Sequence, residues 1–536
     1  MVFEWLAREG WIVISWWALV TLAGAAVLPL CWRLLGALPD KGYTLARAMG
    51  LLLTGFVFWL LSSFGFLRND NGGILLAWLL TFALALTVYL RGESFDWRSW
   101  WRENRTVVLL AELLFIVLLV GWAIFRAHQN EIRTTEKPMD LMFLNSIMRS
   151  PQMPPNDGWM SGYSISYYYF GYLMAAMLSK LSGIPASAGY NMTNVMVFAL
   201  TGLTAFGVAY NLVRSRALRD PSPDPVATAS LPARRPALFA GVLALVMVTL
   251  MGNWQMALVE FPYQARIASE SYLDFTATQA RDEYPERTAA REASIPDSEP
   301  VTLAPGRPDP TTWEWWWWFR ASRVLQDFDL NGEVAQVAQP ISEFPQFSFL
   351  LSDNHPHVMA LPFVLLVLGL ALNLLLVGRA PNRDETLLYG LAAGALVFLN
   401  TWDGPIYIAA LVGAEGLRRL MSGQGRLQQR DWWALVRFGL TLGLLTAIFY
   451  LPFLISFRSQ ASGLLPNIIS PTLFQHLVIM FGPFILILGF FLSVEAWRAG
   501  WRMNWRWGVQ GALGLFGVLA LVMIALILVA LLIPQV

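Results

Sequence analysis

Long runs of apolar residues, interrupted by few charges, recur along almost the whole chain. A helix needs about 20 apolar residues to cross the roughly 30 Å of hydrocarbon in a bilayer. Candidate segments begin near residues 11, 45, 73, 106, 162, 191, 236, 357, 386, 404, 433, 472 and 507. Because a spanning chain must satisfy its backbone hydrogen bonds internally, the sequence predicts an all-α, polytopic transmembrane protein with about 12–13 spans.

The composition supports this fold class and excludes others. Of 536 residues, 56% are hydrophobic and 14% are charged, whereas a soluble chain carries about 25% charged residues. The 25 tryptophans suit a membrane interface. A net charge of +1 argues against nucleic acid as a partner. We therefore expect membrane lipid as the partner, and the sequence implies no particular protein partner.

The N-terminal segment predicts a permanent span. It carries Glu4, Arg8 and Glu9, with no basic stretch or small-residue cleavage site of a signal peptide. Cys31 is the only cysteine, which rules out an intramolecular disulfide and a cysteine-based metal site.

Lysine and arginine in short connections predict the orientation of the spans, because they favour the cytoplasmic side. The basic connections hold Arg33, Lys41 and Arg47; Arg91, Arg98, Arg102 and Arg105; Arg214, Arg216, Arg219, Arg234 and Arg235; Arg379 and Arg383; Arg418, Arg419, Arg426 and Arg430; and Arg498, Arg502 and Arg506. The resulting division is 1–126, membrane spans; 127–190, a first outer loop with an amphipathic helix and a Tyr-rich segment; 191–260, spans; 261–354, a large outer loop; and 355–536, C-terminal spans.

This orientation requires an even number of crossings between Arg126 and Asn191. The Tyr-rich segment 163–181 alone would break that parity. We expect this segment to be re-entrant or juxtamembrane, or Met139–Met148 to dip into the bilayer and complete a pair. Within the large loop, 261–312 is rich in Ser, Pro and charges and is expected to be mobile. The following Trp313–Phe319 favours an interfacial anchor over an aromatic sugar-binding platform.

The first outer loop holds two acids beside a short predicted helix. Pro138 suits a helix start, and apolar spacing predicts a helix over 139–149 lying along the membrane. Glu136 precedes this helix near its positive end, which suits a general base for a lipid-linked substrate, and Asp140 lies in its first turn. An ordinary solvated loop is the alternative.

Tyrosine is concentrated between residues 163 and 172, where five occur in ten positions. A buried hydroxyl needs a hydrogen-bond partner, so pure lipid contact does not explain so many. Tyr167, Tyr168 and Tyr169 predict either an aromatic belt or a polar groove that receives hydroxylated or phosphorylated groups.

Acidic and histidine side chains also meet at the ends of two later spans. Asp353, His355 and His357 occupy alternate positions, so an extended backbone points them the same way. Three readings stay open: contact with a phosphate or substrate, capping, or a divalent metal ion at Asp353 and His357. In Asn400-Thr-Trp402-Asp403, an acid lies between two apolar segments without a nearby basic partner, which is typical of functional acids in membranes.

These segments together resemble the motifs of the YYY-domain family of membrane proteins, which is named for three consecutive tyrosines. The matching motifs are Glu136–Asp140, Tyr167–Tyr172, Ser322-Arg323, Glu343-Phe344-Pro345, Asp353–His357 and Asn400–Asp403. Two departures are Asn354, where leucine is expected, and a long acidic insert before Trp313.

That family is similar to the C-type (GT-C) membrane glycosyltransferases, which use sugars linked to lipid phosphates. The resemblance implies a GT-C-like fold and an inverting glycosyltransferase. Such an enzyme would move a sugar from a polyprenyl-phosphate donor to an acceptor at the extracytoplasmic face of the cell membrane.

Within this interpretation each group has an expected role. Glu136 is the expected catalytic base, and Asp140 orients it or the acceptor. The remaining substrate-binding candidates are Arg149, Tyr167, Tyr168, Tyr169, Arg323, Glu343, Asp353, His355, His357, Trp402 and Asp403. Arginine and histidine are suited to the phosphate leaving group, so no cofactor is required. The alternatives are a polyprenyl-lipid transporter or flippase, and a non-catalytic subunit of a membrane complex.

Overall fold

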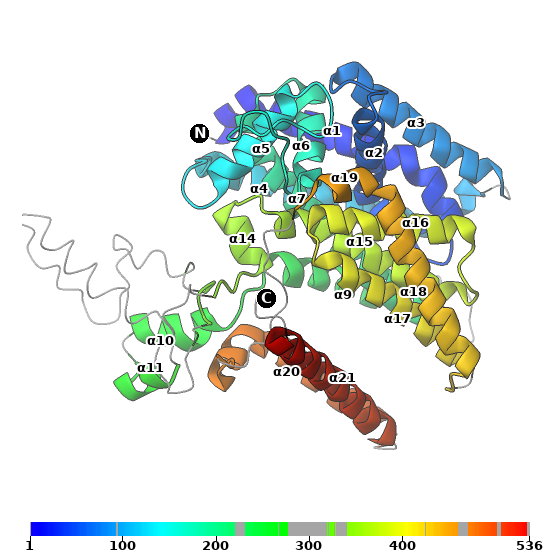
Figure 1. Cartoon of the computed structure of the whole chain (residues 1–536), viewed down its shortest axis with the longest axis vertical. Coiled ribbons are helices and arrows are strands. Elements are labelled where there is room, and N and C mark those ends of the chain that lie inside the picture. The colour runs from blue at the N-terminus through cyan, green and yellow to red at the C-terminus, as the bar shows by residue number, and fades with distance from the viewer. Residues whose placement is uncertain are drawn as a thin grey trace, which may run out of the picture. The chain divides into compact units, whose positions relative to one another are not determined.

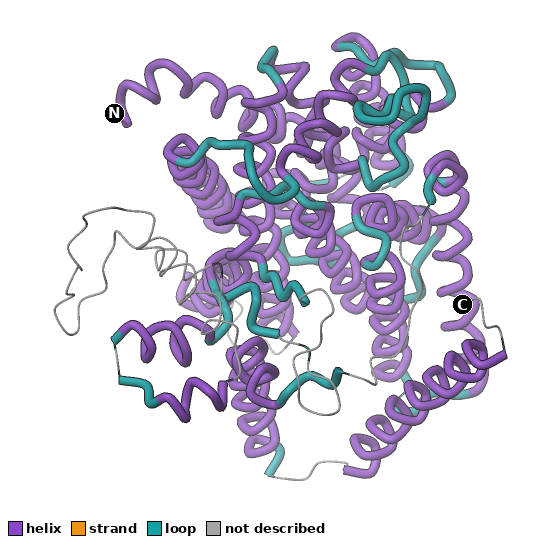
Figure 2. Tube along the Cα trace, turned by 60° about the vertical axis from the view of Figure 1, so that its left-hand side comes forward, coloured by secondary structure: helices purple, strands orange, loops and turns teal. Residues whose placement is uncertain are grey.

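The computed structural model describes residues 2–92, 95–219, 231–265, 267–276, 321–325, 340–423, 425–458, 470–500 and 505–532, together with residues 319 and 327. These residues form helices, turns and loops, and their only bridged pair is Asn156 with Ser164 (Figure 2). The predicted all-α class is therefore confirmed over the described part of the chain.

Twelve of the described helices have 17 residues or more. They are α1 (Val2–Leu34), α2 (Ala46–Ser63), α3 (Asn71–Leu90), α4 (Trp97–His128), α7 (Ala186–Arg219), α9 (Leu231–Leu250), α15 (Pro356–Val377), α16 (Arg383–Leu399), α17 (Asp403–Ser422), α18 (Gln429–Phe449), α20 (Phe474–Arg498) and α21 (Trp505–Leu532). Nine of the described helices are long and apolar enough to cross a membrane, judged by length and composition. The prediction of a polytopic helical membrane protein is confirmed.

The shorter elements connect these helices. They are η1 (Tyr43–Leu45), α5 (Lys137–Arg149), α6 (Phe170–Ser182), the π-helical η2 (Met256–Glu260), α10 (Phe261–Gln264), α11 (Glu270–Thr276), α14 (Pro345–Leu351) and α19 (Leu451–Ser456).

The chain divides into two compact units, which are described separately. The first contains residues 1–251 and 348–458, and the second contains 252–347 and 459–536. In the first unit, α7 packs against α4, α9 and α15, while α1 packs against α2 and α3 (Figure 1). Helices α2 and α7 are mostly buried inside this unit, whereas few residues of α3 and α18 are buried and several of their large apolar side chains are exposed. Such exposed apolar faces are suited to lipid.

In the second unit, the chain after α9 packs on α20. The backbone N–H of Trp254 donates to the carbonyl of Ile479 at 2.8 Å, and Val259, Val324, Ile479 and Met480 form a small apolar cluster.

Helix α6 bears on the parity of the spans in the first unit. It has 13 residues, and a rise of 1.5 Å per residue makes it about 20 Å long, too short for a full span. Its residues from Phe170 to Ser179 are nevertheless buried by protein. With α5 equally short, neither helix crosses on its own, which fits the even number of crossings expected here.

The predicted mobile stretch 261–312 lies outside the described residues beyond Thr276, as does the Trp-rich block except Phe319.

Candidate functional site

Helix α5 positions the two acids of its N-terminal end differently. The helix runs from Lys137 to Arg149, with Pro138 in its first turn and Glu136 as N-cap. The Glu136 side chain is 55% exposed, whereas Asp140 is 0% exposed. The predicted helix is present, but Asp140 does more than stabilise its first turn, because its carboxylate points into the protein.

Four side chains from two distant segments meet here, and we call them the acidic cluster: Glu136, Asp140, Asp353 and His355. Glu136 forms an ion pair with Nε2 of His355. Nδ1 of His355 lies 3.4 Å from Asp353 Oδ1 and 3.9 Å from Asp140 Oδ2. The first two acids lie on α5 and its cap, and the other two residues lie directly before α15. The structure therefore joins the two motifs that carry most of the predicted chemistry.

The backbone around the cluster is strained. Positive φ angles occur at Thr134 (67°), Thr135 (49°) and Ser352 (61°). For a β-branched residue such as threonine, this backbone conformation costs of order 1–3 kcal/mol of conformational energy. Ser352 is held by two contacts that sequence reasoning missed. Its hydroxyl accepts from Arg126 Nη1 at 2.6 Å, and its carbonyl accepts from the Tyr190 hydroxyl at 3.2 Å.

The charges of the cluster shift one another. Burial alone would lower the pKa of His355, but the hydrogen bond to Asp353 and the neighbouring charges of Asp140, Asp353 and Glu136 raise this pKa to about 9. Burial, reinforced by Asp353, raises the pKa of Asp140 well above its usual value. Burial acts in the same direction on Asp353, but hydrogen bonds from His355 and Asp140 outweigh it and lower that pKa. These shifts favour the protonated imidazolium of His355 beside the carboxylate of Asp353, while Asp140 holds its proton more strongly than an exposed aspartate does.

The acidic cluster has side chains that could hold a metal ion. Asp140 Oδ2 and Asp353 Oδ1 are buried and receive no donor in hydrogen-bond geometry from the described residues. One ligand atom from each of Asp140, Asp353 and His355 lies within 4.8 Å of the others. Oxygen and imidazole ligands suit a divalent metal ion, which would be held by these three residues. This group shares Asp353 with the pair expected from sequence, Asp353 and His357, and contains Asp140 and His355 in place of His357.

The tyrosines differ in their surroundings. Tyr167 is half-buried and stacks on Phe143 with ring centroids 5.0 Å apart, and its neighbour Tyr168 packs on Phe457. Tyr169 is 1% exposed, and its hydroxyl accepts from Trp59 Nε1 at 3.0 Å, so it is a core residue. Tyr172, which was not assigned a role from sequence, donates its hydroxyl to Asp140.

The remaining candidates lie around or away from the cluster. The His357 ring lies 5.6 Å from the His355 ring. Asp403 accepts from Asn400 at 3.1 Å, and Trp402 is 49% exposed. Arg149 lines a separate cavity of 540 Å³ along α5. Arg323 and Glu343 belong to the second unit.

Comparison with known proteins gives one match. A family model described as "Uncharacterized membrane protein (DUF2298)" matches residues 53–536. No curated protein and no solved structure matches the chain. Since the match covers most of the chain, the chain belongs to this family.

Proposed function

We propose that this member of the DUF2298 membrane protein family is an inverting glycosyltransferase. It would move a sugar from a polyprenyl-phosphate donor to an acceptor hydroxyl at the extracytoplasmic face of the cell membrane. The observation that carries the proposal is the acidic cluster, in which an exposed carboxylate lies against a half-buried, charged imidazole. The resemblance of its motifs to those of the YYY-domain and GT-C proteins supports the same activity.

The chemistry follows from the different exposure of the groups. Glu136 is accessible and accepts the acceptor's proton as its oxygen attacks the anomeric carbon. The anomeric C–O bond to phosphate breaks, and the polyprenyl phosphate leaves with the electron pair. Attack by one oxygen as the other departs inverts the anomeric configuration.

His355 is suited to the leaving phosphate. Its imidazolium is kept charged by Asp140 and Asp353 behind it. Its Nε2–H, which pairs with Glu136 in this structure, would turn to the phosphate when Glu136 takes the acceptor's proton, and charge-assisted hydrogen bonds to phosphate are strong. Tyr172 on α6 donates a hydrogen bond to Asp140 and fixes its position. The charged imidazole of His355 is therefore held in place before the sugar donor binds. A divalent ion held by Asp140, Asp353 and the neutral form of His355 would be an alternative source of positive charge for the same phosphate, because it would replace the proton of the imidazolium.

The test is a transfer assay with the full chain in proteoliposomes. The probe is a short-chain polyprenyl-phosphate hexose with a labelled sugar, added with membranes that lack the chain as the source of acceptor. We expect label to enter an acceptor with wild type and not with Glu136→Gln. Movement of intact labelled lipid between leaflets, without transfer and with equal rates in both proteins, would establish a transporter instead.

A further inference from the structure

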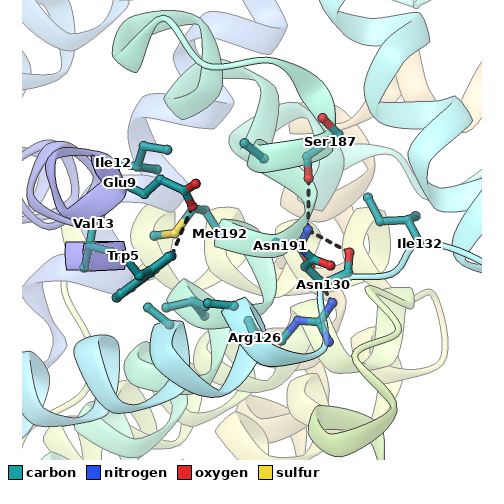
Figure 3. Close-up of a pocket in the computed structure, with 14 residues that line it drawn as sticks. Trp5, Glu9, Ile12, Val13, Arg126, Asn130, Ile132, Ser187, Asn191 and Met192 are labelled. Atoms are coloured by element: carbon teal, nitrogen blue, oxygen red, sulfur yellow. Dashed lines mark hydrogen bonds between the residues drawn. The ribbon is translucent and has the colours of Figure 1, made fainter. Parts of the chain in front are cut away.

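A second cavity lies in the first unit, apart from the acidic cluster. It has a volume of 330 Å³ and is formed where α1 and α7 begin and α4 ends (Figure 3). The polar lining residues are Glu9, Arg126, Asn130, Ser187 and Asn191.

The lining changes from polar to apolar along the helices. Near the helix ends the lining mixes the polar residues with Trp5, Ala127 and Ala188. Further into the helices it is entirely apolar and consists of Ile12, Val13, Ala123, Met192 and Val195. Because α1, α4 and α7 are all long enough to cross a membrane, this gradient follows the depth axis of a bilayer. A cavity with this polarity matches an amphiphile with a headgroup above its chains.

Arg126 provides the strongest sign of a ligand. Its side chain is 2% exposed, and its Nε has no hydrogen-bond partner among the described residues. Its other nitrogens donate to Ser352 and Asn191, which are neutral. By contrast, the buried Arg47 pairs with Glu112 at 2.6 Å. A buried guanidinium without an anion is costly, so a bound anion is needed to balance Arg126.

The surrounding groups select a phosphate and an amine. The N-terminal turn of α7, which contributes Ser187 and Ala188 to the lining, favours an anion, and a guanidinium suits phosphate oxygens. Across the cavity, the Glu9 carboxylate is oriented by Trp5, whose Nε1 donates to it at 3.0 Å (Figure 3). A carboxylate on the opposite wall disfavours a purely anionic headgroup and suits a primary amine.

The pairing of Glu9 with its sequence neighbour leaves this carboxylate available to an amine. Arg8 lies 3.7 Å from the Glu9 oxygen, but the Arg8 side chain is 80% exposed. An ion pair so open to water contributes little. The Glu9 side chain is itself 46% exposed, and an ammonium group bound inside the cavity would compete with Arg8 for this carboxylate.

We propose that this cavity binds a zwitterionic aminophospholipid, with its phosphate on Arg126 and its amine toward Glu9. The site is separate from the acidic cluster and does not depend on the proposed transferase activity. It is nevertheless linked to the cluster, because Arg126 also holds Ser352, the residue before Asp353. The lipid would therefore help to fix the turn that presents Asp353.

The experiment uses the full chain, stripped of lipid in detergent, with dioleoyl phosphatidylethanolamine as probe and native mass spectrometry as readout. We expect one retained lipid, at least tenfold weaker retention for Arg126→Gln, and the same loss for Ala188→Phe, which fills the cavity without changing charge. Arg133→Gln is the matched control, because this exposed arginine lies in the loop after α4, pairs with Glu131 and does not line the cavity.

Each of the following outcomes would overturn the proposal. The first is equal retention by wild type and both cavity variants. The second is displacement of the lipid by millimolar inorganic phosphate, which would make the site one for free phosphate. The third is retention of phosphatidylglycerol as strong as that of phosphatidylethanolamine, or an unchanged preference in Glu9→Gln. Melting temperatures of all variants are compared in parallel, so that an unfolded variant is not counted as a binding loss.

Discussion

At the residue scale, two acids four positions apart on α5 have opposite environments. Glu136 precedes the helix and stays accessible, whereas Asp140 turns inward onto Tyr172 and His355. Sequence spacing indicated the accessible position of Glu136 but not the burial of Asp140, which depends on α6 lying alongside α5. Glu112, an acid inside an apolar run, is explained by its ion pair with Arg47.

The first prediction separates these two acids. Glu136→Gln preserves size but removes the base, so transfer should fall about a hundredfold or more, with an unchanged melting temperature. Asp140→Asn keeps an acceptor for Tyr172 but alters the buried charges, so it should cost mainly stability. Glu131→Gln is the control, because that acid is exposed in the same loop. Full activity of Glu136→Gln with an inert, folded Asp140→Asn would reverse our assignment of the base.

The second prediction concerns pH. The pKa of His355 is about 9 in the folded protein, above its ordinary value of 6.5. The bound proton therefore stabilises the fold fully below pH 6.5, and this contribution is lost as pH rises through about 9. Thermal melts of wild type should show this loss between those values, and melts of His355→Gln should not. His128→Gln, at the exposed end of α4, should behave as wild type; an identical alkaline loss in His355→Gln would contradict the shift.

At the scale of elements, apolar runs predicted the helices well because a spanning helix needs length and apolarity, both of which are local properties. The short buried α6 was harder, since its surroundings rather than its length keep it inside the protein. The sequence predicts the two segments of the acidic cluster separately, but not that they come together. The alternate spacing of Asp353 and His355 was visible in the sequence, but their meeting with α5 arises from packing between distant segments.

The third prediction tests the close crossing of α1 and α2. A Cβ on Gly50 of α2 would lie 2.0 Å from the backbone oxygen of Ala23 on α1, so the helices must separate to admit it. Gly50→Ala should therefore destabilise the protein by about 1–3 kcal/mol. Gly121→Ala on α4 meets nothing within 4 Å and should be neutral or stabilising by up to about 1 kcal/mol. Thermal unfolding followed by intrinsic fluorescence gives both values, and equal effects would refute this close contact.

At the scale of the whole molecule, the order of long helices and basic connections predicts one topology. Between α4 and α7 the described chain contains only α5 and α6, each of 13 residues, and neither is long enough to cross. Between α9 and α15 the described helices are shorter still. With one crossing each by α7 and α9, we expect both motif-bearing segments to emerge on the same side, as one site built from both requires.

The last prediction tests this common side with single cysteines in a Cys31→Ser background. Glu131 follows α4 and Ile341 precedes α15, and both are exposed; we expect cysteines there to react with an impermeant thiol reagent on intact cells. Arg379 follows the C-terminal end of α15, Ser422 ends α17, and both are exposed. The arginine-rich connections at these helix ends favour the cytoplasm. Cysteines at those positions should react only after permeabilisation. If the positions 131 and 341 were labelled from opposite sides, the loop before α15 could not supply Asp353 and His355 to the same aqueous face as Glu136, and the single-site proposal would fail.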